Sequence, residues 1–294
     1  MDIRQIKYFI AVADAKNLSL AAKSLFITQP TLSQTLKKIE SELNTPLFSN
    51  NNKGFQLTKM GELLYSRGKI IVNDFDSMVE EIQLTSQGKK ESLKIGIASL
   101  FAIQFMEQIS KFIAIHSGIE LHFIQDGSIK LQERLAQGAI DIALISFPQY
   151  QEDIVIEPLQ TTTQGYDVSV VMEKNNPLAS RKSVGLIDIK NEKISSLTDN
   201  FMLGKLIIER SRSLGFTPDI VFLHDDWDVL IHSLHNLHAV CLLPSDFEKF
   251  CYVPDIAWVP LADKNNYYPI GIALRKDFTC THAMSEFIEA IKQN

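Results

Sequence analysis

The stretch ITQPTLSQTLKKIESEL, residues Ile27 to Leu43, has the pattern of an amphipathic helix. Thr28 is a suitable N-cap, and Pro30 falls in the first turn, where a missing N–H costs little. Apolar residues recur at helical spacing and predict one buried face. They are Leu32, Leu36, Ile39 and Leu43.

The opposite face of this helix is polar and positively charged, with no carboxylate at its centre. It consists of Pro30, Ser33, Gln34, Lys37, Lys38 and Ser41. The whole chain has a net charge of −6, but residues 1–90 contain 12 Lys and Arg against 9 Asp and Glu, which gives +3 there and −9 for residues 91–294. A mildly basic head on an acidic body would confine binding of phosphates to the head.

The segments around residues 27–43 predict further short elements. Before it, apolar residues at helical spacing indicate two short helices, the second capped by Ser19 and carrying Ala21, Ala22 and Leu25. After it, strand signals at 46–48 and 55–57 flank a turn cluster at 50–54, which predicts a hairpin wing. Residues 58–87 predict one long helix that packs against a second copy of itself or against its own domain.

Beyond a hinge at residues 88–91, the pattern changes to alternating strands and helices. Strands are expected at 93–97, 121–125 and 141–145, and helices at 101–116 and 129–137. This alternation predicts parallel strands with crossover helices in a doubly wound layout. Small-molecule sites in such folds lie at the carboxyl ends of the strands, close to helix N-termini.

Composition fits a globular protein of about two domains, since the 294 residues are 45% hydrophobic and 22% charged. No apolar run reaches the ~18 residues of a membrane span, and the first residues lack a signal-peptide pattern. The three cysteines lack the spacing of a disulfide framework or zinc knuckle, although Cys241 with Cys251 is a weak candidate for a redox pair. We therefore expect a cytoplasmic protein.

The chain resembles the LysR-type transcriptional regulators over nearly its whole length. The most specific part is MDIRQIKYFIAVADAKNLSLAAKSLFITQPTLSQTLKKIESELNTPLF followed by GFQLTKMGELLY, which looks like the winged helix-turn-helix of that family. Looser agreement comes from LKIGIAS, LQERLAQGAIDIALI, NNPLA, AVCLLP and a closing strand and helix between about residues 269 and 292.

The resemblance implies a winged helix-turn-helix N-terminal domain built mainly of helices, a long linker helix that dimerises, and an α/β effector domain. The effector domain would have two Rossmann-like lobes, like a type II periplasmic binding protein. The implied boundaries are 1–58 for the DNA-binding domain, 59–90 for the linker helix and hinge, and 91–294 for the effector domain, with lobe one at 91–161 and 267–294 and lobe two at 162–266. The function implied is a regulator that binds an interrupted dyad near promoters as a homotetramer, responds to a small-molecule effector and contacts RNA polymerase.

Carrying the family's DNA contacts over by position gives Gln29, Thr31, Ser33, Gln34 and Lys37 on the third helix, with Lys53 on the wing. Two positions depart from the family pattern, because many members have arginine where Gln34 and Asn50 stand. Glutamine can pair bidentately with adenine, so this chain is expected to read a different half-site.

The same comparison places effector contacts at Ser99, Leu100, Phe101, Ser128, Phe147, Thr198 and Phe201. None of these is an arginine, and Leu100 and Phe101 are bulky. We therefore expect the cleft to hold a monoanion, a more apolar molecule or little at all, with no resident cofactor. Each of these residues also has an ordinary interpretation as a helix cap or a core aromatic.

One run of histidines suggests a metal enzyme as a competing class. His232, His235 and His238 are spaced by three residues, but on a helix the first and third lie ~120° apart and do not converge on one ion. The sequence also lacks a G-x-x-x-x-G-K-[ST] phosphate loop, a G-x-S-x-G elbow and an H-E-x-x-H motif. We expect a regulator and not an enzyme, the other alternative being an architectural DNA-binding protein with a vestigial cleft.

Overall fold

The computed structural model describes residues 1–51, 54–86, 90–160, 165–264, 266–276 and 280–292. It divides into two units, one of residues 1–89 with 137–139 and one of residues 90–136 with 140–294. Within the described residues, no helix has the length and apolar composition that crossing a membrane would need.

The first unit begins with three helices, α1 (Ile3–Ala15), α2 (Leu18–Ser24) and α3 (Gln29–Leu43). The predicted start of α3 is confirmed, since the Thr28 hydroxyl accepts a hydrogen bond from the Thr31 amide at 3.3 Å. Leu32, Leu36 and Ile39 are buried against α1 and α2, whereas Leu43 is 41% exposed. The buried stripe therefore ends one turn earlier than the apolar pattern predicted.

The prediction that Ser19 caps the second helix is wrong. Asn17 is the N-cap, and its side-chain oxygen accepts hydrogen bonds from the amides of Ser19 at 2.9 Å and Leu20 at 3.0 Å. Asn17 has the extended backbone that capping requires, whereas Ser19 already lies in the first helical turn. The hydroxyl of Ser19 instead donates to Oε1 of Gln29 on α3.

A two-stranded wing follows α3, formed by antiparallel β1 (Phe48–Asn51) and β2 (Gly54–Leu57). Part of the predicted turn cluster belongs to β1, and residues 52–53 lie outside the described residues. Oε1 of Glu40 on α3 accepts hydrogen bonds from the amides of Leu47 at 2.7 Å and Phe48 at 3.3 Å, which fixes the wing to the helix. The predicted long helix is α4 (Lys59–Ser86).

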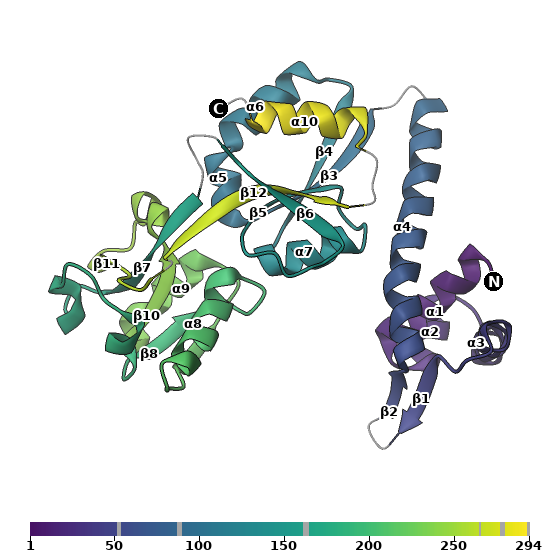
Figure 1. The fold of residues 1–294 in the computed structure, drawn as a ribbon, viewed down its shortest axis with the longest axis horizontal. Coiled ribbons are helices and arrows are strands. Elements are labelled where there is room, and N and C mark those ends of the chain that lie inside the picture. Colours follow the sequence, from purple (N-terminus) through teal and green to yellow (C-terminus); the bar gives the residue numbers. More distant parts are fainter. Residues whose placement is uncertain (52–53, 87–89, 161–164, 265, 277–279, 293–294) are drawn as a thin grey trace. The chain divides into compact units, whose positions relative to one another are not determined.

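In the part of the chain that the structure describes, the second unit is built on a mixed sheet of ten strands (Figure 1). Along the sheet the order is β4-β3-β5-β12-β7-β10-β8-β9, with β6 on β12 and β11 on β7. The strands are β3 (Glu91–Ile97), β4 (Ile119–Gln125), β5 (Ile142–Ser146), β6 (Ile154–Pro158), β7 (Gly165–Glu173), β8 (Lys193–Ser196), β9 (Asp219–Leu223), β10 (Ala239–Pro244), β11 (Ile256–Pro260) and β12 (Tyr267–Arg275).

The sheet forms two lobes. Lobe one contains β3 to β6, and the predicted parallel pairing is confirmed for β3 with β4 and with β5. Lobe two contains β8 to β11, with β8 parallel to β9 and to β10. Antiparallel β7 and β12 join the lobes, because they pair with each other and each also pairs within one lobe.

Helices cover these strands. They are α5 (Ser99–Gln104), α6 (Met106–Ile115), α7 (Ser128–Ala136), α8 (Met202–Ser213), α9 (Trp227–Leu237) and α10 (His282–Lys292), with short 3₁₀ turns η1 (Pro177–Ser180), η2 (Leu186–Ile189) and η3 (Ser245–Phe250). In lobe one, α6 and α10 lie on one face of the sheet and α7 on the other (Figure 1). The rings of Phe112 and Phe287 join α6 to α10, edge to face with centroids 5.4 Å apart.

The single helix predicted for residues 101–116 is interrupted. Phe105 leaves helical geometry with φ −101° and ψ 7°, and it separates α5 from α6. Its side chain is fully buried in the core. Apolar periodicity continues across the break, so the pattern did not distinguish two helices from one.

Candidate functional site

The outer face of α3 is the candidate nucleic-acid interface. Pro30, Gln34 and Lys37 are exposed and Ser33 is half-buried. Among the described residues, the side chains of Gln34 and Lys37 have no hydrogen-bond or ion-pair partner. Both are therefore available to an incoming molecule.

The other predicted DNA contacts have partners within the unit or fall outside the description. Gln29 accepts from Ser19, and the Thr31 hydroxyl lies 2.8 Å from that of Thr28. These bonds hold the first turn of α3 in place. Lys53 lies outside the described residues.

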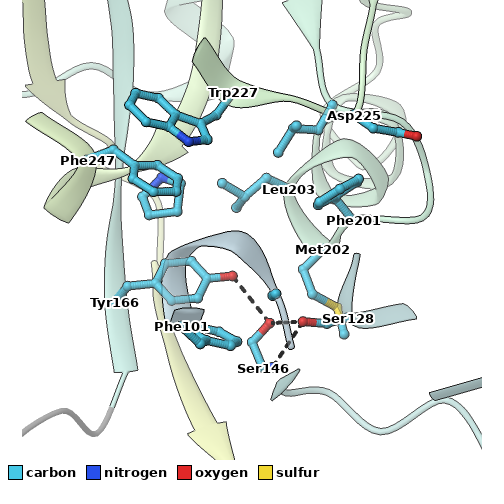
Figure 2. Close-up of a pocket in the computed structure, with 13 residues that line it drawn as sticks. Phe101, Ser128, Ser146, Tyr166, Phe201, Met202, Leu203, Asp225, Trp227 and Phe247 are labelled. Carbon is cyan, nitrogen blue, oxygen red and sulfur yellow. Dashed lines mark hydrogen bonds between the residues drawn. The ribbon is translucent and has the colours of Figure 1, made fainter. Parts of the chain in front are cut away.

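The second unit has a cavity of about 50 Å³ between its two lobes (Figure 2). Lobe one, β7 and lobe two all contribute to the lining. The lining residues are Ala98, Phe101, Ser128, Ser146, Tyr166, Leu197, Phe201, Met202, Leu203, Asp225, Trp227, Pro244 and Phe247.

Three hydroxyls form a chain on one wall of this cavity (Figure 2). The Tyr166 hydroxyl donates to Oγ of Ser146 at 3.3 Å, and Ser146 donates to Oγ of Ser128 through its hydroxyl at 3.2 Å and its amide at 3.1 Å. Burial raises the pKa of Tyr166, so the phenol stays protonated and acts as a donor. All three side chains are buried.

Aromatic rings form much of the remaining wall. Trp227 at the start of α9 stacks on Phe247 of η3, with ring centroids 4.3 Å apart and planes 9° apart. Phe101 of α5 lies 6.2 Å from Tyr166 of β7 in a tilted arrangement. The cavity is thus lined by a flat aromatic pair from lobe two opposite rings from lobe one and β7.

Three of the predicted effector contacts line this cavity: Phe101, Ser128 and Phe201. Phe147 does not, because it packs against the apolar cluster beneath α7. Thr198 does not either, since its hydroxyl donates to the carboxylate of Asp225. Ser99 and Leu100 open α5, but their side chains lie outside the described residues.

Several lining residues were not predicted from the sequence. Ser146 is the last residue of β5, directly before Phe147, so the strand-end rule pointed to within one residue of it. Trp227 follows Asp226, which N-caps α9 by accepting from the Asp228 amide at 3.0 Å. No local signal marks Tyr166, because it lies inside a strand and reaches the cavity only through the pairing of β7 with β12.

Charge is scarce in the cavity. No lysine, arginine or histidine is among the lining residues that the structure describes. Asp225 is the one acidic residue among the described lining residues, and it is exposed to solvent.

The histidine run forms a different site from the one that the metal hypothesis required. His235 and His238 converge on Glu173 at the end of β7, with Nδ1 to carboxylate oxygen distances of 2.7 and 3.0 Å. His232 instead lies 3.9 Å from Asp228. Among the described residues there is no group of three His, Cys, Asp or Glu side chains suited to a metal ion.

Both ring nitrogens of His235 face acceptors, since Nε2 also lies 3.0 Å from the carbonyl oxygen of Pro254. Only the imidazolium form donates at both positions. The hydrogen bond to Glu173, then the Pro254 carbonyl, raise the pKa of His235 above 6.5, with a smaller contribution from Asp255. Hydrogen bonds from His238 and His235 lower the pKa of Glu173 below 4.5.

We expect this contact to make folding stability depend on pH. Because the folded pKa of His235 is raised, its contribution is complete below pH 6.5, the unfolded value, and is lost as pH rises through the folded pKa. The lowered pKa of Glu173 means that its contribution is present above pH 4.5 and is lost as pH falls through the folded pKa. Thermal unfolding from neutral to alkaline pH should therefore show a steeper fall in Tm for the wild type than for His235→Gln.

His232→Gln is the matched control on the same helix, because its ring is 65% exposed and lies 3.9 Å from Asp228. It should keep the wild-type dependence of Tm on pH. Identical slopes for the wild type and His235→Gln would show that the Glu173 contact is not linked to folding.

The cysteines do not show the features of a redox pair. Burial raises the pKa of Cys241, whereas a reactive thiol needs a lowered one. Cys251 is half-buried and Cys280 is exposed.

Known proteins match the chain across both units. The family description "Bacterial regulatory helix-turn-helix protein, lysR family" fits residues 3–62, and "LysR substrate binding domain" fits residues 86–294. The transcriptional dual regulator GltC of Bacillus subtilis (strain 168) is 29% identical over 100% of this chain and 97% of its own length. The HTH-type transcriptional regulator AlsR of the same organism is 25% identical over 92% of this chain and 93% of its own length.

Solved structures agree on the fold. The crystal structure of CbnR, a LysR family transcriptional regulator, superposes with a TM-score of 0.65 at 19% identity and covers 100% of this chain and 99% of that one. Full-length CbnR complexed with its target DNA gives a TM-score of 0.63. With the winged helix-turn-helix and the two-lobed sheet, these matches show that the chain belongs to the LysR family of DNA-binding transcriptional regulators.

Proposed function

We propose that this regulator binds double-stranded DNA as a homodimer joined through α4, and that two dimers form a homotetramer on an interrupted dyad near a promoter. The observation that carries the proposal is an exposed apolar stripe on α4. Ile71, Phe75, Met78 and Ile82 recur at helical spacing and are 51%, 39%, 47% and 61% exposed. A stripe of this kind on a long helix is stabilised by packing against a partner helix.

A two-fold dimer would present two copies of α3 to the DNA. Each outer face, with Gln34 and Lys37 exposed, fits a major groove, and the attached wing would lie beside the phosphate backbone. Two-fold symmetry in the protein then requires two inverted half-sites in the operator.

The cavity between the lobes is the proposed site of a small-molecule effector. Because its walls come from both lobes, a ligand there would change how the lobes lie relative to each other and, through them, the contacts of the tetramer with RNA polymerase. The regulator needs no resident cofactor for this role. Since it acts on the chromosome, we place it in the cytoplasm.

Selection of genomic fragments by the purified full chain tests this function. The recovered fragments should come from promoter regions and contain inverted half-sites, and DNase footprints should be symmetric about their centre. Mass photometry of the complex should give the mass of four chains on one fragment. Recovery of random fragments, or one chain per fragment, would contradict the proposal.

A further inference from the structure

The cavity between the lobes leaves hydrogen-bond donors without acceptors. Ser128 is 4% exposed, and its oxygen accepts both the hydroxyl and the amide of Ser146. Tyr166 and Ser146 donate their hydroxyl protons within this series of hydrogen bonds. The hydroxyl proton of Ser128, the last member, is not used in the series. Among the described residues the Ser128 hydroxyl donates no hydrogen bond, and a buried donor without a partner is costly.

A second donor lies in the opposite wall. The indole of Trp227 lines the cavity, and its N–H has no hydrogen-bond partner among the residues that the structure describes. Indole nitrogen only donates. A molecule in the cavity that carries an acceptor oxygen or nitrogen can therefore bond this N–H.

The rest of the wall favours a flat, apolar body. Trp227 stacked on Phe247 offers one aromatic face, and Phe101 lies with Tyr166 on the other side (Figure 2). Leu203 and Met202 add apolar surface to the lining. Offset stacking of a ring on such faces is favourable beyond the area that it buries.

The cavity has no cationic side chain among its described lining residues to pair with an anion. A buried carboxylate needs a cation or several donors, but none of the described lining residues is cationic and Asp225 lines its edge. Helices α7, α8 and α9 begin at the lining residues Ser128, Met202 and Trp227, and each N-terminus supplies about half a unit of positive charge. That fraction suits the negative end of a carbonyl dipole.

We infer that the effector of this regulator is a small uncharged molecule with a flat apolar body and a carbonyl oxygen, held by the Ser128 hydroxyl and the Trp227 indole. This inference rests on the proposed effector function and names the chemistry of its ligand. The expectation from the sequence was a monoanion, a more apolar molecule or little at all, and this inference selects the more apolar molecule. The carbonyl oxygen is the acceptor that the hydroxyl chain lacks.

Three probes of the same shape test this inference by titration calorimetry on the full chain. Benzamide is uncharged and has the carbonyl, benzoate replaces it with a carboxylate, and benzylammonium carries a positive charge. Benzamide should bind about tenfold tighter than either charged probe, since an uncompensated buried charge costs at least that factor. Tighter binding of benzoate or benzylammonium, or no saturation with benzamide up to its solubility limit, would overturn the inference.

Two variants locate the carbonyl contact. Ser128→Ala and Trp227→Phe should each weaken benzamide severalfold and leave toluene, which has the ring but no acceptor, bound as in the wild type. Ser110→Ala is the matched control, because that exposed hydroxyl bonds only the carbonyls of its own turns on α6. Equal loss of benzamide and toluene would indicate a change in cavity shape and contradict the hydrogen-bond role.

Operator binding by the same samples distinguishes a failure of the inferred ligand class from a failure of the proposed DNA-binding function. If DNA fragments are selected but benzamide does not bind, the inferred ligand class is wrong and the proposed regulatory function is retained. If benzamide binds but no fragment is selected, the proposed DNA function fails and the cavity chemistry stands.

Discussion

Replacing Gly127 with alanine is expected to push the two lobes apart beside the cavity. Gly127 precedes α7 in lobe one, and a Cβ there would lie 2.2 Å from the carbonyl oxygen of Asn200 and 2.9 Å from the amide nitrogen of Phe201 in lobe two. Both neighbours are backbone atoms, so no change of rotamer relieves the overlap. The adjacent Ser128 and Phe201 both line the cavity, so its opposite walls would separate.

Hydrogen exchange at the Ile129 amide measures this separation of the lobes. The Ile129 N–H lies in the first turn of α7 and donates across the lobes to the Asn200 carbonyl oxygen at 3.1 Å. Overpacking of this kind costs about 1–3 kcal/mol, and each 1.4 kcal/mol is about a factor of ten, so hydrogen exchange at Ile129 should accelerate about tenfold or more. Benzamide affinity should fall with it.

Gly118→Ala is the matched control, because nothing lies within 4 Å of a Cβ at that position. Its exchange at Ile129 should match the wild type. If Gly127→Ala exchanges at the wild-type rate, the backbone contact between the lobes does not hold them together in solution.

The fold was predictable where a local pattern determines it. The apolar stripe and Thr28 cap identified α3, and alternating strands and helices identified the parallel part of lobe one. Errors arose where two local choices have similar free energies. Asn17 and Ser19 are both good caps, and the break at Phe105 coincides with burial of its own ring in the core.

The candidate cavity was less predictable because its walls come from segments far apart in sequence. Ser128 and Phe201 follow strand ends, where the general rule for α/β sheets places ligands. Tyr166 and Phe247 reach the same space only after β7 has paired with both β12 and β10. Thr198 was predicted to line the cavity but does not. Its hydroxyl donates to the carboxylate of Asp225 instead.

Gln34→Ala is expected to relax specificity at one base position of each half-site. Gln34 is exposed on α3 and has no side-chain partner among the described residues, so its amide can pair bidentately with adenine. Loss of that pair should cost about 1–3 kcal/mol on the operator and leave binding to random DNA nearly unchanged. Fluorescence anisotropy against operators substituted at each position measures both quantities, and equal loss on operator and random DNA would exclude base reading.

Lys37→Ala should behave in the opposite way, because a lysine that contacts phosphate carries no sequence information. Binding to operator and random DNA should weaken together, and the slope of log affinity against log salt should fall by about one unit per contact. Lys38→Ala is the matched control on the same helix, since Lys38 is also exposed but points about 100° around the helix from Lys37. The Lys38 variant should change the salt slope less. If both variants changed the salt slope equally, Lys37 would make no particular phosphate contact and the positive charges of α3 would act together over a distance. Specificity would then depend on Gln34 and its neighbours alone.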